Sequence, residues 1–189
     1  MTSTDFEPST DTAALTGTWT IDAAHSRVGF VTRHAMVTKV RGQFRDVEGT
    51  IVIDAADHKA SSAVVTLQVA SVDTGQAQRD EHLRTGDFFD AAAYPTITFR
   101  STDVEVDGAE IKLKGDLTIK DVTRPVELDL EFTGTATDPF GNVRAGFDGK
   151  TTVKRTDWGL TYNAALETGG VLISDKTTLE FEISVIKSA

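Results

Sequence analysis

Hydrophobic and polar residues alternate strictly along three segments of the chain. In residues 110–120 the apolar side chains take odd positions, and Lys, Asp and Thr take even ones. Residues 126–133 and 179–185 show the same period of two. Because successive side chains of a strand point to opposite faces, each segment predicts an antiparallel strand with one buried and one wet face.

Weaker alternation covers most of the remaining chain, in residues 18–22, 26–33, 43–54, 62–72, 96–106 and 143–154. Asp107-Gly108 joins two alternating runs as a hairpin turn would, and residues 138–142 form a second turn cluster. About eight to ten short strands with almost no helix predict an all-β sandwich or a closed antiparallel barrel. We favour the barrel, because closure leaves no exposed edge strands.

Two segments break the alternation and predict short helical caps. Within residues 74–95, the stretch 76–84 is rich in helix formers. Within residues 155–170, the stretch 164–167 could hold one helical turn. Both segments connect predicted strands, so we expect them to cap or flank a mouth of the barrel.

The composition predicts one globular domain and excludes several classes of function. The chain has 189 residues, of which 39% are hydrophobic, which suffices for one core. Its 19 Lys and Arg against 29 Asp and Glu give a net charge of −10. This charge argues against nucleic acid and against anionic membrane surfaces as partners. The absence of Cys excludes disulfides, thiolate metal sites and Cys nucleophiles.

The first 17 residues differ in composition from the rest of the chain. We predict that residues 1–17 form a disordered acidic segment and that residues 18–187 form the domain. Residues 1–18 contain no Lys, no Arg and no long apolar run, so they do not resemble a secretory signal. No stretch approaches the roughly 18 apolar residues of a membrane span. The expected location is therefore the cytoplasm.

Candidate catalytic chemistry is sparse. The four histidines, at positions 25, 34, 58 and 82, lack the spacing of metal ligands, and no metal or cofactor is expected. Asp80 with Glu81, or Asp87 with Asp90, could do acid–base work near the predicted helix. A structural role is the better interpretation, because Asp80 can bond to nearby backbone N–H groups.

Aromatic side chains are the most abundant candidate for a binding surface, since the chain has ten Phe, two Trp and two Tyr. A barrel of about eight strands either is filled by its side chains or holds one small ligand. Composition does not separate a packed core from a lined cavity, and both stay open at this point.

Several uncommon short sequence motifs occur one after another along the chain. The opening GTWTIDAAHSRVGFVTRH, at residues 17–34, resembles the W-x-I-D-x-x-H-S-x-V-x-F-x-x-x-H start of the YceI-like family of bacterial lipid-binding proteins. The family's motifs T-G, R-D-x-H-L, F-F-D and Y-P-x-I-T-F follow within residues 71–102. GDLTIKDVTRPVEL at 115–128 and RTDWGLTYN at 155–163 complete a resemblance that covers nearly the whole chain after residue 17.

This resemblance implies an extended, lipocalin-like, eight-stranded antiparallel barrel around a long apolar tunnel. It implies binding, transport or storage of a polyisoprenoid or another long-chain amphiphile, without turnover. Matching positions place six residues in the tunnel wall: Phe30, Phe88, Phe89, Phe99, Leu117 and Trp158. The alternation alone adds Phe44, Leu67, Phe132 and Phe147.

Four polar residues also match positions of the family motif: His25, Arg79, Asp80 and His82. The motif does not say whether they contact a ligand head group, and we favour a structural role in which they hold the cap against the barrel. Many members carry a signal peptide that this sequence lacks. Asp121 stands where the family often has Gly, and Asp also suits a turn.

Two other functions stay open. One is an enzyme that acts on an isoprenoid-type lipid at the tunnel mouth through the region of Asp80 and His82. The other is a scavenger of apolar stress compounds or antibiotics in the same tunnel. A homodimer is compatible with either, because symmetric pairs are the commonest assemblies.

Overall fold

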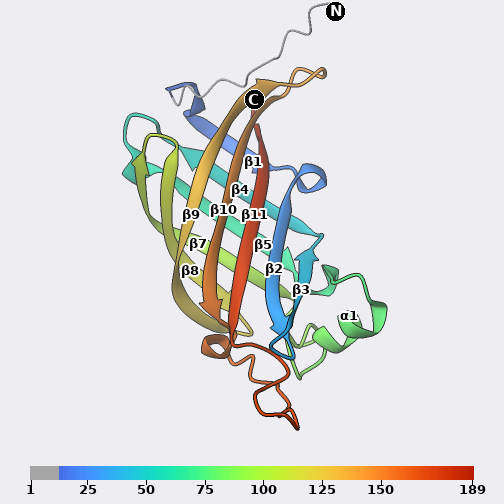
Figure 1. Ribbon diagram of the computed structural model, residues 1–189. Helices are drawn as coiled ribbons and strands as arrows, with labels where there is room; N and C mark the ends of the chain where they lie inside the picture. Colours follow the sequence, from blue (N-terminus) through green and yellow to red (C-terminus); the bar gives the residue numbers. More distant parts are fainter. Residues whose placement is uncertain (1–12) are drawn as a thin grey trace, which may run out of the picture.

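A computed structural model describes residues 13–189 of the chain, which contain eleven β-strands and one α-helix, α1 (Ala77–Leu83) (Figure 1). The strands are β1 (Gly17–Ile21), β2 (Arg27–His34), β3 (Thr38–Phe44), β4 (Val47–Ile53), β5 (Ser62–Gln68), β6 (Val72–Asp73), β7 (Thr96–Asp107), β8 (Glu110–Ile119), β9 (Val122–Thr137), β10 (Val143–Lys154) and β11 (Lys176–Lys187). Short 3₁₀ turns lie at Ala13–Leu15, Ala23–His25, His58–Ala60, Val69–Ser71 and Arg155–Trp158.

The strands form a closed antiparallel barrel of eight long strands. Three of these are interrupted, because β1 continues into β2, β3 into β4 and β5 into β6, each after a short irregular segment. β11 pairs with β1 near its end, at Val185–Lys187, and with β2 nearer its start. This double pairing closes the meander, and the prediction of a barrel rather than a sandwich is confirmed.

The three strictly alternating segments lie in β8, β9 and β11, as predicted, and the weaker segments lie in the other strands. At each interruption the inward-facing positions change parity. Trp19 and Ile21 face inward in β1, whereas Val28 faces inward in β2. Likewise Phe44 is buried before the break between β3 and β4, and Val47 is buried after it. These breaks explain why alternation is weak in the first half of the chain.

The helical segments follow the sequence only in part. The predicted helix at residues 76–84 is confirmed as α1, which lies beside one end of the barrel (Figure 1). The turn predicted at residues 164–167 is wrong, because the helical turn forms at Arg155–Trp158. There the Asp175 carboxylate accepts hydrogen bonds from the Thr156 amide at 3.2 Å and from its hydroxyl at 2.7 Å, which fixes the turn.

Order at the start of the domain begins before residue 18. Ala13–Leu15 form a 3₁₀ turn, and β1 begins at Gly17. The Leu15 side chain is buried, and its carbonyl accepts a 2.8 Å hydrogen bond from Trp19 Nε1. Residues 13–17 of the predicted disordered segment are therefore ordered, and residues 1–12 lie outside the described part of the chain.

A charged network joins the first strand to the β9–β10 turn. Arg144 Nη1 lies 2.7 Å from Asp22 Oδ2, and Arg144 Nε lies 2.8 Å from Asp138 Oδ2. Hydrogen bonds from this guanidinium hold the pKa of both carboxyl groups below the ordinary Asp range. Both carboxylates are therefore charged and bonded at neutral pH.

This network predicts an acid-sensitive part of the stability. Because both pKa values are lower in the folded state, the stabilisation is present above the unfolded Asp value of about 3.9. It is lost as the pH falls toward the lowered folded values. Arg144→Gln should therefore flatten the dependence of the free energy of unfolding on pH below about pH 4, as measured by urea unfolding across acidic buffers. Arg100→Gln, on the exposed face of β7, should keep the wild-type slope, and an unchanged slope in Arg144→Gln would contradict the assignment.

Candidate ligand-binding cavity

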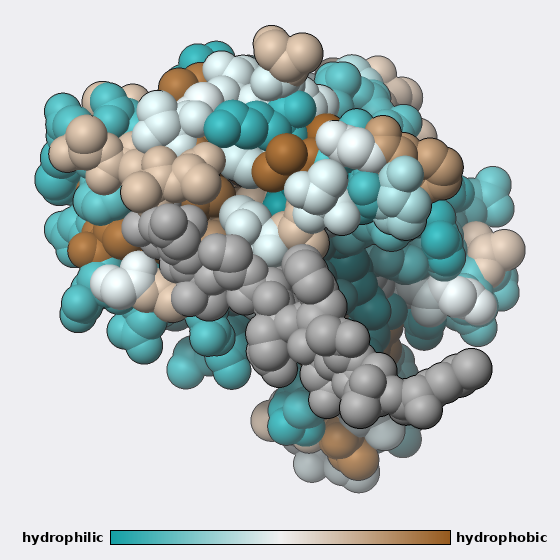
Figure 2. All heavy atoms as spheres, turned by 90° about the horizontal axis from the view of Figure 1, so that it is seen from above, coloured by the Kyte–Doolittle hydropathy of each residue, from teal (hydrophilic) through white to brown (hydrophobic). Residues whose placement is uncertain are grey.

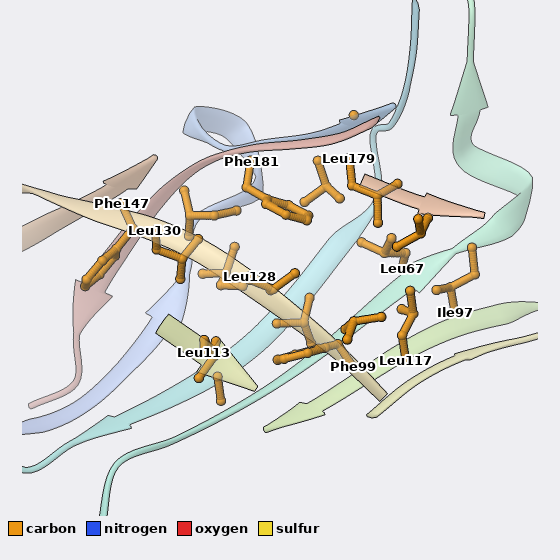
Figure 3. A pocket seen from close by; sticks show the side chains of 18 of the residues that line it. Leu67, Ile97, Phe99, Leu113, Leu117, Leu128, Leu130, Phe147, Leu179 and Phe181 are labelled. Atoms are coloured by element: carbon orange, nitrogen blue, oxygen red, sulfur yellow. The ribbon is translucent and has the colours of Figure 1, made fainter. Parts of the chain in front are cut away.

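An elongated cavity of about 310 Å³ runs inside the barrel, within the size range of small-molecule sites (Figure 3). Its wall is almost entirely apolar, and side chains from both halves of the chain converge on it. Figure 3 labels ten of the lining residues: Leu67, Ile97, Phe99, Leu113, Leu117, Leu128, Leu130, Phe147, Leu179 and Phe181. The interior is therefore a lined space rather than a filled core.

Two glycines help to keep this space open. A Cβ atom at Gly42 would overlap the ring of Phe30 on the paired strand, and one at Gly115 would overlap the ring of Phe99. Only glycine lets these rings lie against the barrel wall. The aromatic side chains thereby cover the backbone, and the centre of the barrel remains available to a ligand.

All ten residues that the sequence placed in the tunnel wall line this cavity: Phe30, Phe44, Leu67, Phe88, Phe89, Phe99, Leu117, Phe132, Phe147 and Trp158. Their contact with a ligand stays a prediction. Trp158 is additionally anchored, because its Nε1 donates a 2.9 Å hydrogen bond to the Leu117 carbonyl. Leu113, Leu128, Leu130, Leu179, Phe181 and Ile183 were not predicted as wall residues, although the strict alternation already placed them on an apolar face.

Arg155 is a buried cation in the cavity wall that sequence reasoning did not identify as a site residue. Its Nε donates to the Ser174 carbonyl at 3.0 Å, and its two terminal nitrogens donate to the carbonyls of Leu160 and Ile173. Burial lowers the pKa of this guanidinium. The side chain thus fastens both ends of the long β10–β11 connection to the barrel.

The four predicted polar residues do not line the cavity among residues 13–189. The buried Asp80 accepts hydrogen bonds from the Thr74 amide at 2.8 Å and from its hydroxyl at 2.5 Å. Arg79 donates to the same hydroxyl at 2.7 Å and to the Thr74 carbonyl at 2.8 Å. Both side chains therefore fix the start of α1 relative to β6.

The two predicted histidines lie apart. His25 bonds to Asp22 at 2.7 Å on the outside of the barrel. His82 Nε2 lies 2.8 Å from Asp87 Oδ2, and its ring centroid lies 5.0 Å from that of Phe88 and 5.1 Å from that of Tyr162. This aromatic cluster joins the α1 segment to the β10–β11 connection. Tyr162 was not predicted, because no local pattern relates it to His82.

Asp80→Ala should lower the free energy of unfolding by about 1–3 kcal/mol, because it leaves the Thr74 amide and hydroxyl without their buried acceptor. Urea unfolding measures this change. Glu81→Ala, at the adjacent exposed position, should have little effect. Equal stability of the two variants would contradict the anchoring role of Asp80.

Within residues 13–189, no group of three or more His, Asp or Glu side chains is arranged to hold a metal ion. None of the helices in the described part of the chain has the length and apolar character needed to span a bilayer.

The closed antiparallel meander and its apolar interior define a lipocalin-like β-barrel. The chain belongs to the family of YceI-like domains, whose sequence model matches residues 19–185. It is 40% identical to protein YceI of Escherichia coli O157:H7 over 139 residues, which are 74% of this chain and 73% of that protein.

Solved structures share the fold. BcnA of Burkholderia cenocepacia matches with a TM-score of 0.76 and 25% identity, over 87% of this chain and 98% of that one. A polyisoprenoid binding domain from Saccharophagus degradans, implicated in plant cell wall breakdown, matches with a TM-score of 0.69 and 20% identity. That match covers 90% of this chain and 98% of the other.

Proposed function

We propose that this protein binds a long-chain amphiphile, a polyisoprenoid or a similar lipid, in the barrel cavity and carries or stores it without turnover. The observation that carries this proposal is the apolar wall along the cavity. Burial of each CH₂ group contributes about 0.8 kcal/mol, so a ten-carbon chain gains about 8 kcal/mol before the costs of ordering. Such a ligand needs few polar contacts.

Membership of the YceI-like family and the polyisoprenoid binding of one protein with this fold support the same ligand class. Two of the polar residues that match the family motif, Asp80 and Arg79, support binding over catalysis. Both Asp80 and Arg79 are hydrogen-bonded to Thr74, and neither lines the cavity. A carrier needs only that the wall excludes water from the bound chain.

Native mass spectrometry of freshly purified protein, followed by organic extraction, tests the proposal. We expect a discrete additional mass that extracts as a prenyl or acyl lipid. Delipidated protein should then bind a long-chain amphiphile saturably, with one molecule per barrel. Absence of both the co-purified lipid and saturable binding would contradict the proposal.

The same preparation separates the two alternatives. Conversion of a bound prenyl lipid into a product, lost in Asp80→Asn, would indicate an enzyme. Displacement of the bound lipid by apolar antibiotics, at antibiotic concentrations below that of the lipid, would indicate a scavenger. The cytoplasmic location and the homodimer stay predictions, which cell fractionation and sedimentation would test.

A further inference from the structure

Apolar side chains are exposed at the end of the barrel where β2 turns into β3. Met36 and Val37 form the tip of this hairpin and are 60% and 75% exposed. Ala35 and Met36 have φ angles of 51° and 63°, the left-handed conformation of a tight hairpin turn. The tip therefore presents its two apolar residues to the solvent in a defined conformation.

The β10–β11 connection lies against this tip and extends the exposed apolar surface. The Ala35 amide donates a 2.7 Å hydrogen bond to the Leu172 carbonyl, and His34 forms a β-bridge with Ile173. A Cβ atom at Gly170 would overlap the Met36 sulfur, so the thioether packs directly on this glycine. Val171, the next residue, is 40% exposed. Hairpin and connection therefore form one surface.

Four cations lie beside this surface, as two pairs in which the residues are opposite each other on neighbouring strands. Arg33 lies opposite Lys39 in the β2–β3 ladder, and Lys154 lies opposite Lys176 in the β10–β11 ladder. All four are exposed, and among residues 13–189 none has a carboxylate within 4.0 Å. Like charges in directly opposite positions are destabilising. The Asp175 carboxylate offsets part of this cost at Lys154, and an anionic partner would relieve the rest.

Three of these cations adjoin, in sequence, a residue that lines the cavity. Thr32 precedes Arg33, Val153 precedes Lys154, and Thr177 follows Lys176; all three neighbours line the cavity. Because adjacent residues of a strand point to opposite faces, these three cations lie on the outer surface of the barrel, directly behind the cavity wall. We call this surface the basic tip. Its residues are Arg33, Met36, Val37, Lys39, Lys154, Val171 and Lys176.

Part of the negative charge lies away from the basic tip. Four carboxylates face one another across β8, β9, β10 and β11, well away from the basic tip: Glu110, Glu131, Asp148 and Glu182. At the end of the barrel opposite the basic tip, the visible surface mixes hydrophilic side chains with apolar ones (Figure 2). The net charge of −10 therefore does not describe the surface at the basic tip.

We propose that the basic tip docks on an anionic lipid bilayer and that the cavity exchanges its ligand there. The inference rests on the proposed function, because a long-chain lipid hardly dissolves in water and must pass between the cavity and a membrane. Met36, Val37 and Val171 would enter the interface, where apolar side chains gain by burial. The four cations would lie against the phosphates, where each contributes about 1 kcal/mol, or about fivefold in affinity.

Vesicle flotation tests this docking. Delipidated protein is mixed with vesicles of phosphatidylcholine alone, or of phosphatidylcholine with phosphatidylglycerol, in low salt. We expect binding to the charged vesicles only, and its loss in high salt. Arg33→Gln with Lys39→Gln should weaken binding about 25-fold, the product of about fivefold for each cation. Met36→Asp with Val37→Asp should abolish it.

Matched controls separate the basic tip from general charge and hydrophobicity. Lys112→Gln with Lys150→Gln makes the same change in net charge on the outer wall, and Phe140→Asp changes an exposed apolar residue of the β9–β10 turn. Both controls should bind the charged vesicles as the wild type does. Equal binding by the tip variants and the wild type, or equal wild-type binding to both kinds of vesicle, would overturn the proposal.

A second readout distinguishes docking from ligand binding. Uptake of a dansyl-labelled fatty acid, added without vesicles, should be the same in the wild type, the tip variants and the controls. Normal uptake in a wild type that fails to float with charged vesicles would overturn docking alone. Failure of uptake in all proteins would instead overturn the proposed function, whatever the vesicles show.

Discussion

Leu117→Trp is expected to weaken the binding of a long-chain amphiphile about 50- to 200-fold, because the larger side chain would displace three or four methylene groups at about 0.8 kcal/mol each. Leu117 lies beside Phe99 on the wall of the cavity (Figure 3). The indole would occupy open space rather than a packed core, so the cost of overpacking should be small. Phe99→Trp should act in the same direction with a smaller effect.

Titration with a fluorescent long-chain probe measures the loss, and thermal unfolding shows whether the barrel is retained. Lys112→Trp provides the matched control, because it places the same side chain on the same strand but on the exposed face. The control should bind as the wild type does. Unchanged affinity in both Leu117→Trp and Phe99→Trp would mean that the ligand does not occupy this part of the cavity.

Trp19→Ala is expected to lower the free energy of unfolding by about 3–5 kcal/mol, the usual cost of removing a large buried aromatic side chain. Trp19 is 0% exposed and lies where the barrel closes, opposite Ile51 of β4 and Lys187 of β11. It is not among the residues that line the cavity. The change should therefore reduce stability without changing the affinity of the folded protein for its ligand.

Urea unfolding and probe titration measure the two quantities separately. Trp19→Phe should cost less, since it keeps most of the packing and loses mainly the hydrogen bond to the Leu15 carbonyl. Phe140→Ala, at an 88% exposed position, should leave the stability unchanged. A cost for Trp19→Ala no larger than that of Phe140→Ala would contradict the role of Trp19 in closing the barrel.

The sequence predicted the fold best where one face of a strand is buried without interruption. In β8, β9 and β11 the alternation is strict, and the inward face could be assigned by position alone. It was less informative between residues 17 and 73, where extra residues at the breaks reverse the inward parity. Phe44 and Val47 are both buried although they differ in parity. No count of period two relates such positions across a break.

The candidate site was predicted to a similar extent. The ten wall residues were identifiable because they are large, apolar and placed either by the family motif or by the alternation. Arg155 and Tyr162 were not, since their partners are distant in the sequence and no local pattern relates them. The basic tip was also hidden, because the overall negative charge argued against an anionic surface as a partner.

By itself the sequence determined an all-β chain, the strands of its second half, most of the apolar wall and the membership of the YceI-like family. Only the tertiary structure decided that the interior is a cavity, because alternation says which side chains face inward but not how far the opposite wall lies. The tertiary structure also decided where the charges gather. Arg33 and Lys176 are far apart in the sequence, and only the pairing of β2 with β11 brings them to the same end of the barrel.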